Sequence, residues 1–185
     1  MTSEPRLELR TARLRLVAGS VEMFEAELAS IPKLAGMLDV RPPEVWPPAL
    51  NDKEWTSFEI ARMREVDSQP GWWNWYVILP GTEGDELIGD CGFRGRPDER
   101  GEVEIAYAIL PNYREQGYAS EAAGALTQWA LAEPGVRAVI AGTFAGMIAS
   151  QRVLEKIGFH RDGPGSDPGA LRYRITDSNE SRVAP

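Results

Sequence analysis

The sequence predicts an α+β domain in which a mixed sheet is flanked by helices. Segments with apolar residues at every second position are interspersed with segments whose apolar residues recur at helical spacing. The expected order is strand, helix, helix, three strands, helix, strand, helix, strand, which is not the strict alternation of a parallel α/β sheet. The chain has 185 residues, of which 43% are hydrophobic and 26% charged, enough for one domain with its own core. We therefore expect a single domain over residues 1–185, with fraying at residues 1–9 and 176–185.

The N-terminal half is expected to hold three strands and two helices. Residues 13–17 (RLRLV) alternate charged and apolar side chains, as a half-exposed strand does. Ser20 is a suitable N-cap for the helix that follows, and Asn51 or Asp52 can cap a second helix behind a proline-rich segment. The other expected elements are a helix over residues 20–30 and strands over residues 73–79 and 86–93. The second helix is expected to bury one side, made of Trp55, Phe58, Met63 and Val66.

The C-terminal half is expected to hold the remaining strands and the main helix. In residues 101–110 (GEVEIAYAIL), the side chains from Val103 to Ile109 at odd positions share one face, and those at even positions, Glu104 among them, share the other. The main helix is alanine-rich and would pack on the sheet through Ala119, Ala122, Ala123, Leu126, Trp129 and Ala130. The further expected elements are strands over residues 136–143 and 170–175 and a helix over residues 149–159 that ends at Gly158.

The composition excludes several kinds of site. Cys91 is the only cysteine and His160 the only histidine, so the chain can form neither an intramolecular disulfide nor a zinc cage of cysteine and histidine. We expect no metal site. Cys91 falls inside an apolar strand, where a small buried side chain is more natural than a nucleophile. The net charge of -8 opposes binding to the phosphates of nucleic acids and could attract a cationic partner. The alternative is that this charge serves only solubility.

Two targeting signals are missing from the sequence. No run reaches the ~20 apolar residues that a membrane-spanning helix needs. The N-terminus, MTSEPRLELRT, has no apolar core of the kind that a secretory signal carries. The expected location is therefore the cytoplasm, without membrane association.

A polar turn, YREQGYAS, precedes the main helix. Gly117 allows backbone angles that a side chain forbids, and it lets another molecule approach the main chain. The first N–H groups of a helix have no partner within it, and the helix dipole makes that end positive, so an anion such as a phosphate is the expected guest. Arg114 adds a cation beside the turn. A P-loop is disfavoured because the turn has no lysine, and a Rossmann site because the next strand, ending VIAGT, has no acidic residue for a ribose.

The same turn resembles the pyrophosphate loop of the GNAT family of N-acetyltransferases, whose pattern is Arg/Gln-x-x-Gly-x-Gly/Ala. Arg114, Gly117 and Ala119 stand at the motif positions. With LIGDCGF included, the resemblance runs from Arg10 to Phe159, in the order and spacing of the family. The segments most similar to the subgroup of ribosomal-protein N-terminal acetyltransferases are residues 9–16 (LRTARLRL), 103–122 (VEIAYAILPNYREQGYASEA) and 148–159 (IASQRVLEKIGF).

The resemblance implies a fold and a cosubstrate. The sheet would be mixed and mostly antiparallel, and its fourth and fifth strands would splay apart to hold acetyl-CoA. The pantetheine arm would pair with main-chain groups near Ile109 and Leu110, where a backbone N–H would polarise the thioester carbonyl. The other residues expected to bind the cosubstrate are Arg114, Glu115, Gln116, Gly117, Tyr118, Ala119, Ser120 and Met147.

The resemblance also implies that an acceptor amine attacks directly, with no cysteine nucleophile. Glu104 is the expected base, acting directly or through a water; the family's EIGY reads EIAY here, with Ala106 for glycine. The alternative is that Glu104 is a solvated strand residue, like Glu102. Many relatives donate a proton to the departing thiolate from a tyrosine, but Leu154 stands at that position here. Ser150 matches the serine of the ribosomal-protein subgroup and is the expected proton donor. The alternative for Ser150 is a helix N-cap or first-turn residue.

One position departs from the subgroup pattern. Met147 stands three residues before Ser150, where the subgroup usually carries asparagine, so a hydrogen-bonding group near the pantetheine arm is lost. This departure supports a second hypothesis, a non-catalytic acyl-CoA-binding or regulatory protein on the same scaffold. The leading hypothesis is an enzyme that transfers an acetyl group from acetyl-CoA to a primary amine.

The acceptor is the part of the reaction that the sequence defines least. Five of the six tryptophans lie in the N-terminal half, where they could line a pocket for a small amine or a slot for a peptide N-terminus. The alternative is that Trp73 and Trp75 face the core while Trp46 anchors the proline-rich segment. The acidic composition favours a cationic acceptor, and the family resemblance makes a homodimer a further expectation.

Overall fold

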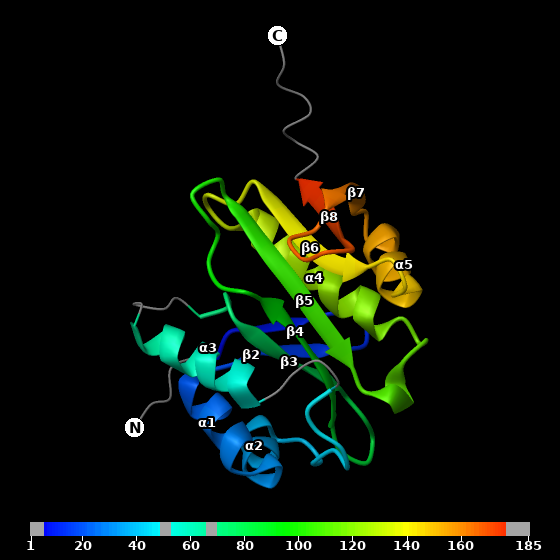
Figure 1. Cartoon of the computed structure of the whole chain (residues 1–185). Coiled ribbons are helices and arrows are strands. Elements are labelled where there is room, and N and C mark those ends of the chain that lie inside the picture. Colours follow the sequence, from blue (N-terminus) through cyan, green and yellow to red (C-terminus); the bar gives the residue numbers. More distant parts are fainter. Residues whose placement is uncertain (1–5, 49–52, 66–69, 177–185) are drawn as a thin grey trace.

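A single twisted sheet crosses the molecule, with helices on both of its faces (Figure 1). The computed structural model describes residues 6–48, 53–65 and 70–176. Within these ranges eight strands pair in the order β1-β2-β3-β4-β5-β6-β8-β7. The strands are β1 (Glu8–Arg10), β2 (Arg15–Ala18), β3 (Asn74–Leu79), β4 (Glu86–Phe93), β5 (Glu102–Ile109), β6 (Ala138–Phe144), β7 (His160–Pro164) and β8 (Ala170–Thr176). The helices are α1 (Val21–Ala29), α2 (Ile31–Leu38), α3 (Lys53–Glu65), α4 (Tyr118–Ala132) and α5 (Ile148–Lys156), and a 3-10 turn, η1, spans Pro111–Tyr113.

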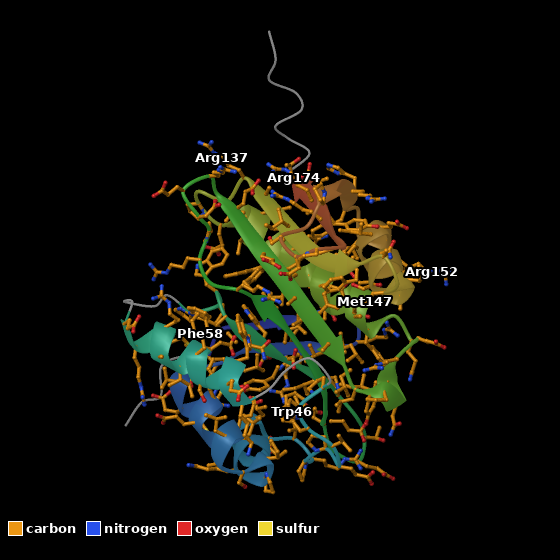
Figure 2. All side chains as sticks on the ribbon, viewed as in Figure 1. Trp46, Phe58, Arg137, Met147, Arg152 and Arg174 are labelled. Carbon is orange, nitrogen blue, oxygen red and sulfur yellow. The ribbon has the colours of Figure 1, made fainter. Side chains whose placement is uncertain are left out.

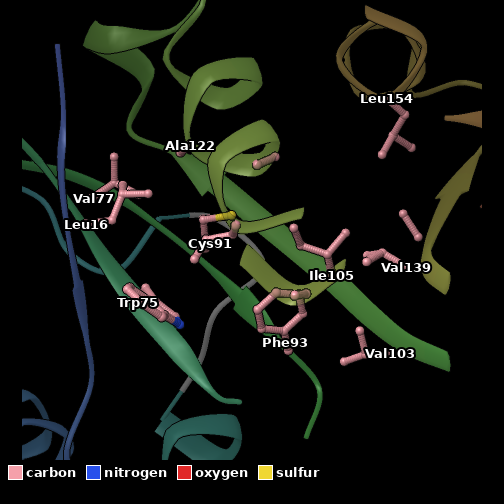
Figure 3. Packing of buried hydrophobic residues seen from close by; sticks show 14 of the residues in the cluster. Leu16, Trp75, Val77, Cys91, Phe93, Val103, Ile105, Ala122, Val139 and Leu154 are labelled. Atoms are coloured by element: carbon pink, nitrogen blue, oxygen red, sulfur yellow. The ribbon is translucent and has the colours of Figure 1, made fainter. Parts of the chain in front are cut away.

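Side chains along a strand alternate between the two faces of the sheet, and each face contributes to a separate hydrophobic core. On β3, Trp75 and Val77 join the cluster beneath α4, while Tyr76 and Ile78 join the cluster beneath α1, α2 and α3. Figure 3 shows the first cluster, in which Cys91 packs among apolar side chains next to α4. Burial raises the pKa of the Cys91 thiol well above its usual range, with a further contribution from the charge of Asp90. The predicted structural role of Cys91 is thus confirmed.

Most predicted elements are present, and the caps predicted at Ser20 and Gly158 are as expected. Ser20 caps α1 by accepting from Met23 N (3.3 Å). Gly158 follows the end of α5 with φ 96, the left-handed conformation that glycine adopts most easily. Trp73 and Trp75 are buried, as the core interpretation required. None of the helices within the described ranges has the length and apolar character needed to cross a bilayer.

Three elements were not predicted. The sequence predicted one strand here, over residues 13–17, whereas the structure has a hairpin in which β1 pairs with β2 around a turn closed by Thr11 and Leu14. The fraying expected at residues 1–9 therefore does not extend to Glu8, while residues 1–5 and 177–185 lie outside the described ranges. The helix α2, which buries Leu34, Ala35 and Leu38, was also missed. So was the edge strand β7, which is largely exposed and lacks an apolar alternation.

The predicted buried face of the second helix is confirmed at Met63 and wrong at Phe58. Helix α3 buries Thr56, Glu59, Ile60 and Met63, whereas Phe58 is 48% exposed. The apolar pattern of the sequence could not identify this side of the helix as the buried one. The side includes the carboxyl group of Glu59, which the pattern counts as polar. Val66 and the proposed caps Asn51 and Asp52 lie outside the described ranges.

The sheet contains one parallel pair, β5 with β6, and this pair creates the gap that the resemblance implied. The two strands are in register at only three positions, from Glu102 opposite Ala138 to Glu104 opposite Ile140. Beyond Glu104 they separate, although each continues for several residues. The splay predicted for the fourth and fifth strands is therefore confirmed, and it falls between β5 and β6.

Candidate active site

The gap between β5 and β6 opens into a cavity of about 660 Å³ that reaches across to α3. Glu104 lines the cavity from β5, while Met147 and Ser150 line it at the start of α5. In the view of Figure 2, Phe58 on α3 and Met147 lie on opposite sides of β5, and both line the cavity. The fold thus brings together three predicted site residues from two separate elements. The polar and aromatic side chains that complete the lining include Glu54, Trp55, Glu59, Asp90, Arg94, Tyr107 and Thr143.

Along the gap, one edge of β5 has no strand partner. On the other edge Leu110 N donates to Ile88 O (2.8 Å), and Arg94 N donates to Glu104 O (3.0 Å). The even-numbered residues of β5 therefore direct their backbone groups toward β4. Because neighbouring residues of a strand direct these groups to opposite sides, the odd-numbered ones face the gap. The residues whose N–H and C=O groups line this open edge are Ile105, Tyr107 and Ile109.

The pantetheine arm was expected to contact the main chain near Ile109 and Leu110, and this geometry decides which of the two residues can make that contact. Both backbone groups of Leu110 are used within the protein, since its carbonyl accepts from Tyr113 N (2.9 Å). Ile109 faces the gap, and its carbonyl accepts from Arg114 Nε (2.9 Å). The Arg114 side chain is thereby fixed where β5 meets the loop. Of the two residues, Ile109 is the one placed to meet a ligand in the gap.

The turn before α4 has the backbone of an anion site. Gly117 is the N-cap residue with φ 84, and no side chain caps the helix. The first N–H with an acceptor is that of Glu121, which bonds Gly117 O (3.0 Å). The N–H groups of residues 117–120 have no acceptor among the described residues, and they lie at the positive end of the helix dipole. The predicted loop residues thus fit a diphosphate.

Arg13, which the sequence analysis did not single out, holds this loop from its outer side. Its guanidinium donates to Gln116 O (2.9 Å), pairs with Glu121 (2.7 Å) and lies 4.5 Å from the centre of the Tyr118 ring. These contacts use a carbonyl, a carboxylate and a ring face, and they leave the N–H groups of the helix start free. The loop is thus fixed without its anion-binding groups being covered.

Ser150 lies in the first turn of α5, and its partner is Tyr107. The N-cap of α5 is Met147, so the alternative that Ser150 caps the helix is wrong, although its first-turn position is as that alternative expected. The Tyr107 hydroxyl donates to Ser150 O (3.1 Å) and lies 3.2 Å from Ser150 Oγ. Burial raises the pKa of Tyr107 to about 12, so the phenol keeps its proton. Tyr107 thus fixes Ser150 at the cavity wall.

Glu104 differs from Glu102 in its surroundings. Glu102 is nearly buried and pairs with Arg172 (2.7 Å) and with Arg174. The Glu104 side chain is 37% exposed and lies in the cavity, with Arg94 Nε at 3.4 Å. The neighbouring Ala106 leaves its surface open, as expected for a carboxylate that must reach a substrate. Of the two glutamates, Glu104 is the one that lines the cavity.

Helix α3 supplies an acidic and aromatic wall on the other side of the cavity. Glu59 is 2% exposed, and its burial, together with the nearby charge of Glu27, raises its pKa to about 8. Glu54 is exposed on the same helix, and the Trp55 ring lies 5.2 Å from the Arg94 guanidinium. Of the tryptophans, Trp55 is the one that lines this cavity. Trp46 instead donates to Glu27 (2.8 Å), as its anchoring role requires.

Comparison with known proteins places this site in a family. A model described as an acetyltransferase (GNAT) domain matches residues 6–160. The N-acetyltransferase YjdG of Bacillus subtilis (strain 168) is 31% identical over 156 residues, which cover 82% of this chain and 88% of that protein. The crystal structure of a GNAT acetyltransferase from Bacillus anthracis superposes with a TM-score of 0.61 at 26% identity, covering 92% of this chain and 98% of that one.

A further solved structure bears on the fold. It is RimL, a ribosomal-protein acetyltransferase in complex with coenzyme A, with a TM-score of 0.64 at 15% identity over 92% of this chain and 98% of that chain.

The chain belongs to the GNAT family of acetyltransferases. Within that family it is an N-acetyltransferase that uses acetyl-CoA, similar to the ribosomal-protein subgroup, so the enzyme hypothesis is confirmed.

Proposed function

We propose that this enzyme acetylates the primary amine of a cationic acceptor, with Glu104 as base and Ser150 as proton donor. The observation that carries the proposal is the shared cavity: both residues line it, and its far wall is acidic. The acceptor would be a small amine or a peptide N-terminus that enters from the side of α3. The cosubstrate would enter from the side of α4.

Two features support the placement of acetyl-CoA. The free N–H groups of residues 117–120 would hold the diphosphate, with Arg114 beside them. The open edge of β5 at Ile109 and Tyr107 would receive the amides of the pantetheine arm, because unpaired backbone groups favour the addition of an extended chain. The arm would then lead from the loop to the cavity that Glu104 and Ser150 line.

The reaction requires that a proton is removed from the attacking amine nitrogen and that a proton is supplied to the departing sulfur. Bound acetyl-CoA supplies a thioester carbon that forms a bond to the amine nitrogen while its bond to sulfur breaks. Glu104 takes a proton from the acceptor ammonium, directly or through a water, because a protonated amine has no lone pair for attack. As the carbon–sulfur bond breaks, Ser150 donates its proton to the sulfur, and the second proton that the nitrogen loses returns to the Ser150 hydroxyl. Tyr107 holds the Ser150 side chain in place.

The charges in the cavity support a cationic acceptor. Of the described side chains that line it, Glu54, Asp90 and Glu104 are acidic, whereas Arg94 is the one basic side chain. Glu59 adds a carboxyl group that is protonated near neutral pH, since its pKa is about 8. An ammonium group entering this cavity would exchange water for carboxylate oxygens, which favours charge-assisted hydrogen bonds.

An assay of thiol release tests the proposed function. The protein is incubated with acetyl-CoA and a panel of cationic, neutral and anionic amines, and free coenzyme A is measured. We expect release that depends on the amine and favours cationic acceptors. Glu104→Gln should lower kcat by roughly 10²- to 10⁴-fold without changing the Kd for acetyl-CoA.

Glu99→Gln serves as the matched control, because Glu99 is an exposed glutamate outside the cavity lining. It should retain full activity. If Glu104→Gln turns over as fast as Glu99→Gln, Glu104 is not the base. If anionic amines are the preferred acceptors, the proposed acceptor class is wrong.

A further inference from the structure

Thr143 on β6 carries a buried hydroxyl with no hydrogen-bond partner. The residue is 4% exposed, and its Oγ1 is one of the few buried side-chain oxygens in the described residues that neither donates nor accepts. Buried hydroxyl groups are normally paired, because leaving water without a new partner costs free energy. Thr143 also lines the cavity. Its unpaired hydroxyl therefore lies beside a space that a ligand can enter.

The register of the sheet locates Thr143 along the gap. The last β5–β6 pair joins Glu104 and Ile140. The same register, extended by three residues, places Thr143 level with Tyr107, whose hydroxyl holds Ser150. Instead of pairing at this level, the two strands have separated. Thr143 therefore stands across the gap from the open edge of β5, at the level of the proposed proton donor.

The edge of β6 that faces away from the gap is already paired within the sheet. On β6 the buried positions alternate with exposed ones from Ala141 to Phe144, and β6 pairs with β8 along its outer edge. The backbone of Thr143 is in register with Leu171 on β8, so the strand is fixed at this point. The hydroxyl is thus presented by a rigid element, as a positioning group requires.

We propose that the Thr143 hydroxyl hydrogen-bonds a carbonyl of the acyl-pantetheine arm and positions that arm in the gap. The inference rests on the proposed placement of acetyl-CoA between β5 and β6. In the free protein the hydroxyl is unsatisfied, and in the complex it donates to the ligand. Thr143 is a positioning residue, because it fixes the arm and moves no proton in the reaction.

Thr127 provides a matched control within the same chain. It is also a threonine with an unpaired buried Oγ1, at 2% exposure, but it lies in α4 and does not line the cavity. Replacing either threonine by valine keeps the shape and removes the unsatisfied hydroxyl. The free protein should therefore melt at the same temperature as wild type, or higher, in both variants. Only Thr143→Val should lose a ligand contact.

The experiment measures the Kd of coenzyme A by calorimetry for wild type, Thr143→Val, Thr143→Ser and Thr127→Val. Adenosine 3′,5′-bisphosphate, which lacks the pantetheine arm, is the second probe. We expect Thr143→Val to bind coenzyme A roughly five- to tenfold more weakly, as for one lost hydrogen bond. Thr143→Ser and Thr127→Val should bind as wild type does, and all four proteins should bind the bisphosphate equally.

Three results would overturn the inference while leaving the proposed function intact. They are an unchanged Kd of coenzyme A in Thr143→Val, an equal loss of affinity for the arm-less nucleotide, and a lowered melting temperature in the free Thr143→Val protein. The last would show that the hydroxyl supports the fold. If wild type itself does not bind coenzyme A, the proposed placement of the cosubstrate fails, and the inference with it.

Discussion

At the scale of single residues, the site depends on pairs whose partners come from different elements. Tyr107 on β5 fixes Ser150 on α5, and Arg94, which directly follows β4, lies beside Glu104 on β5. In the first pair, a phenol that keeps its proton orients the serine hydroxyl that we propose as proton donor. In the second, the guanidinium occupies one side of the carboxylate that we propose as base. Each pair therefore leaves one reactive oxygen at the cavity.

Tyr107→Phe tests the first pair. Removing the hydroxyl frees the Ser150 side chain, so kcat should fall about tenfold while the Kd for acetyl-CoA stays unchanged. Steady-state kinetics and calorimetry check the two quantities. Tyr173→Phe is the control, because Tyr173 bonds Gln151 and Glu155 on the same helix without lining the cavity. Equal kinetics for the two variants would show that Tyr107 does not act through Ser150.

Met147→Asn tests the position that departs from the subgroup. Met147 lines the cavity, is 40% exposed and caps α5 without a side-chain hydrogen bond. A carboxamide there would offer a donor and an acceptor to the arm, so the Kd for acetyl-CoA should fall about fivefold. Calorimetry measures it, with Met147→Leu as the apolar control. A Kd that stays the same in both variants would count against this reading of the position.

At the scale of elements, the loop before α4 supplies an anion site from its backbone alone. Gly117 takes φ 84, and a Cβ built there lies 3.3 Å from the Arg13 guanidinium. The glycine therefore serves both the turn and the close approach of Arg13. The helix start is left with free N–H groups because no side chain caps α4. The guanidinium groups beside it are donors only, and they bond the carbonyl oxygens of Gln116 and Ile109.

Gly117→Ala should affect both folding and binding. The left-handed conformation costs an alanine about 1–2 kcal/mol, and the methyl group displaces the loop, so the Kd for coenzyme A should rise. Gly135→Ala is the control, because Gly135 has φ 88 with nothing near its Cβ position and lies far along the chain from the loop. Chemical denaturation should show similar losses of stability for both. Coenzyme A affinity that drops equally in both would contradict an anion site at residues 117–120.

The elements that the sequence predicted are those with a clear hydrophobic period. Strands β3, β4 and β5 and helix α4 bury continuous or alternating apolar residues, so their patterns indicated both type and place. Helix α2 was missed although it buries Leu34, Ala35 and Leu38 at helical spacing, whereas β7 and the buried side of α3 lack a clear apolar period. Strand β7 is almost wholly exposed, and the buried face of α3 includes Glu59, whose burial depends on neighbours distant in sequence.

At the scale of the whole molecule, the buried carboxyl groups beneath α3 connect the cavity to the core. Glu27 accepts from Trp46 (2.8 Å) and from the Tyr76 hydroxyl (2.7 Å), and burial raises its pKa. Glu59 lies close enough for the charge of Glu27 to raise its pKa further. Two carboxyl groups in one apolar layer make the stability of the fold depend on pH.

Glu59→Gln should remove much of this dependence. The Glu59 pKa is about 8 in the folded protein against 4.5 for the ordinary side chain, so the folded state holds a proton that the unfolded state releases. The wild type should therefore be unaffected below pH 4.5, lose stability as pH rises toward 8, and stay lower above that. At about pH 9 the variant should be more stable than wild type by on the order of a few kcal/mol.

Denaturant titrations at a series of pH values measure this effect. Glu54→Gln is the control, because Glu54 is exposed on the same helix and should keep the slope of the wild type. If Glu59→Gln shows the same pH slope as Glu54→Gln, the Glu59 carboxyl does not hold its proton in the folded state.

Parts of the site could be predicted from the sequence, and parts could not. The loop around Gly117, the base candidate Glu104 and Ser150 follow from a local motif and its spacing. Tyr107 carried a weaker signal, a polar tip within an apolar stripe of one strand, which requires a partner. Arg13 and Thr143 carried none, because their roles arise only when the hairpin meets the loop and when β5 and β6 separate.

The crystal structure of the protein with coenzyme A tests the central claim most directly. We predict the diphosphate within hydrogen-bond distance of the N–H groups of residues 117–120, and the pantetheine arm between β5 and β6 with its sulfur at the cavity of Glu104 and Ser150. Coenzyme A bound outside the gap, or a gap closed by continued pairing of β5 with β6, would contradict it.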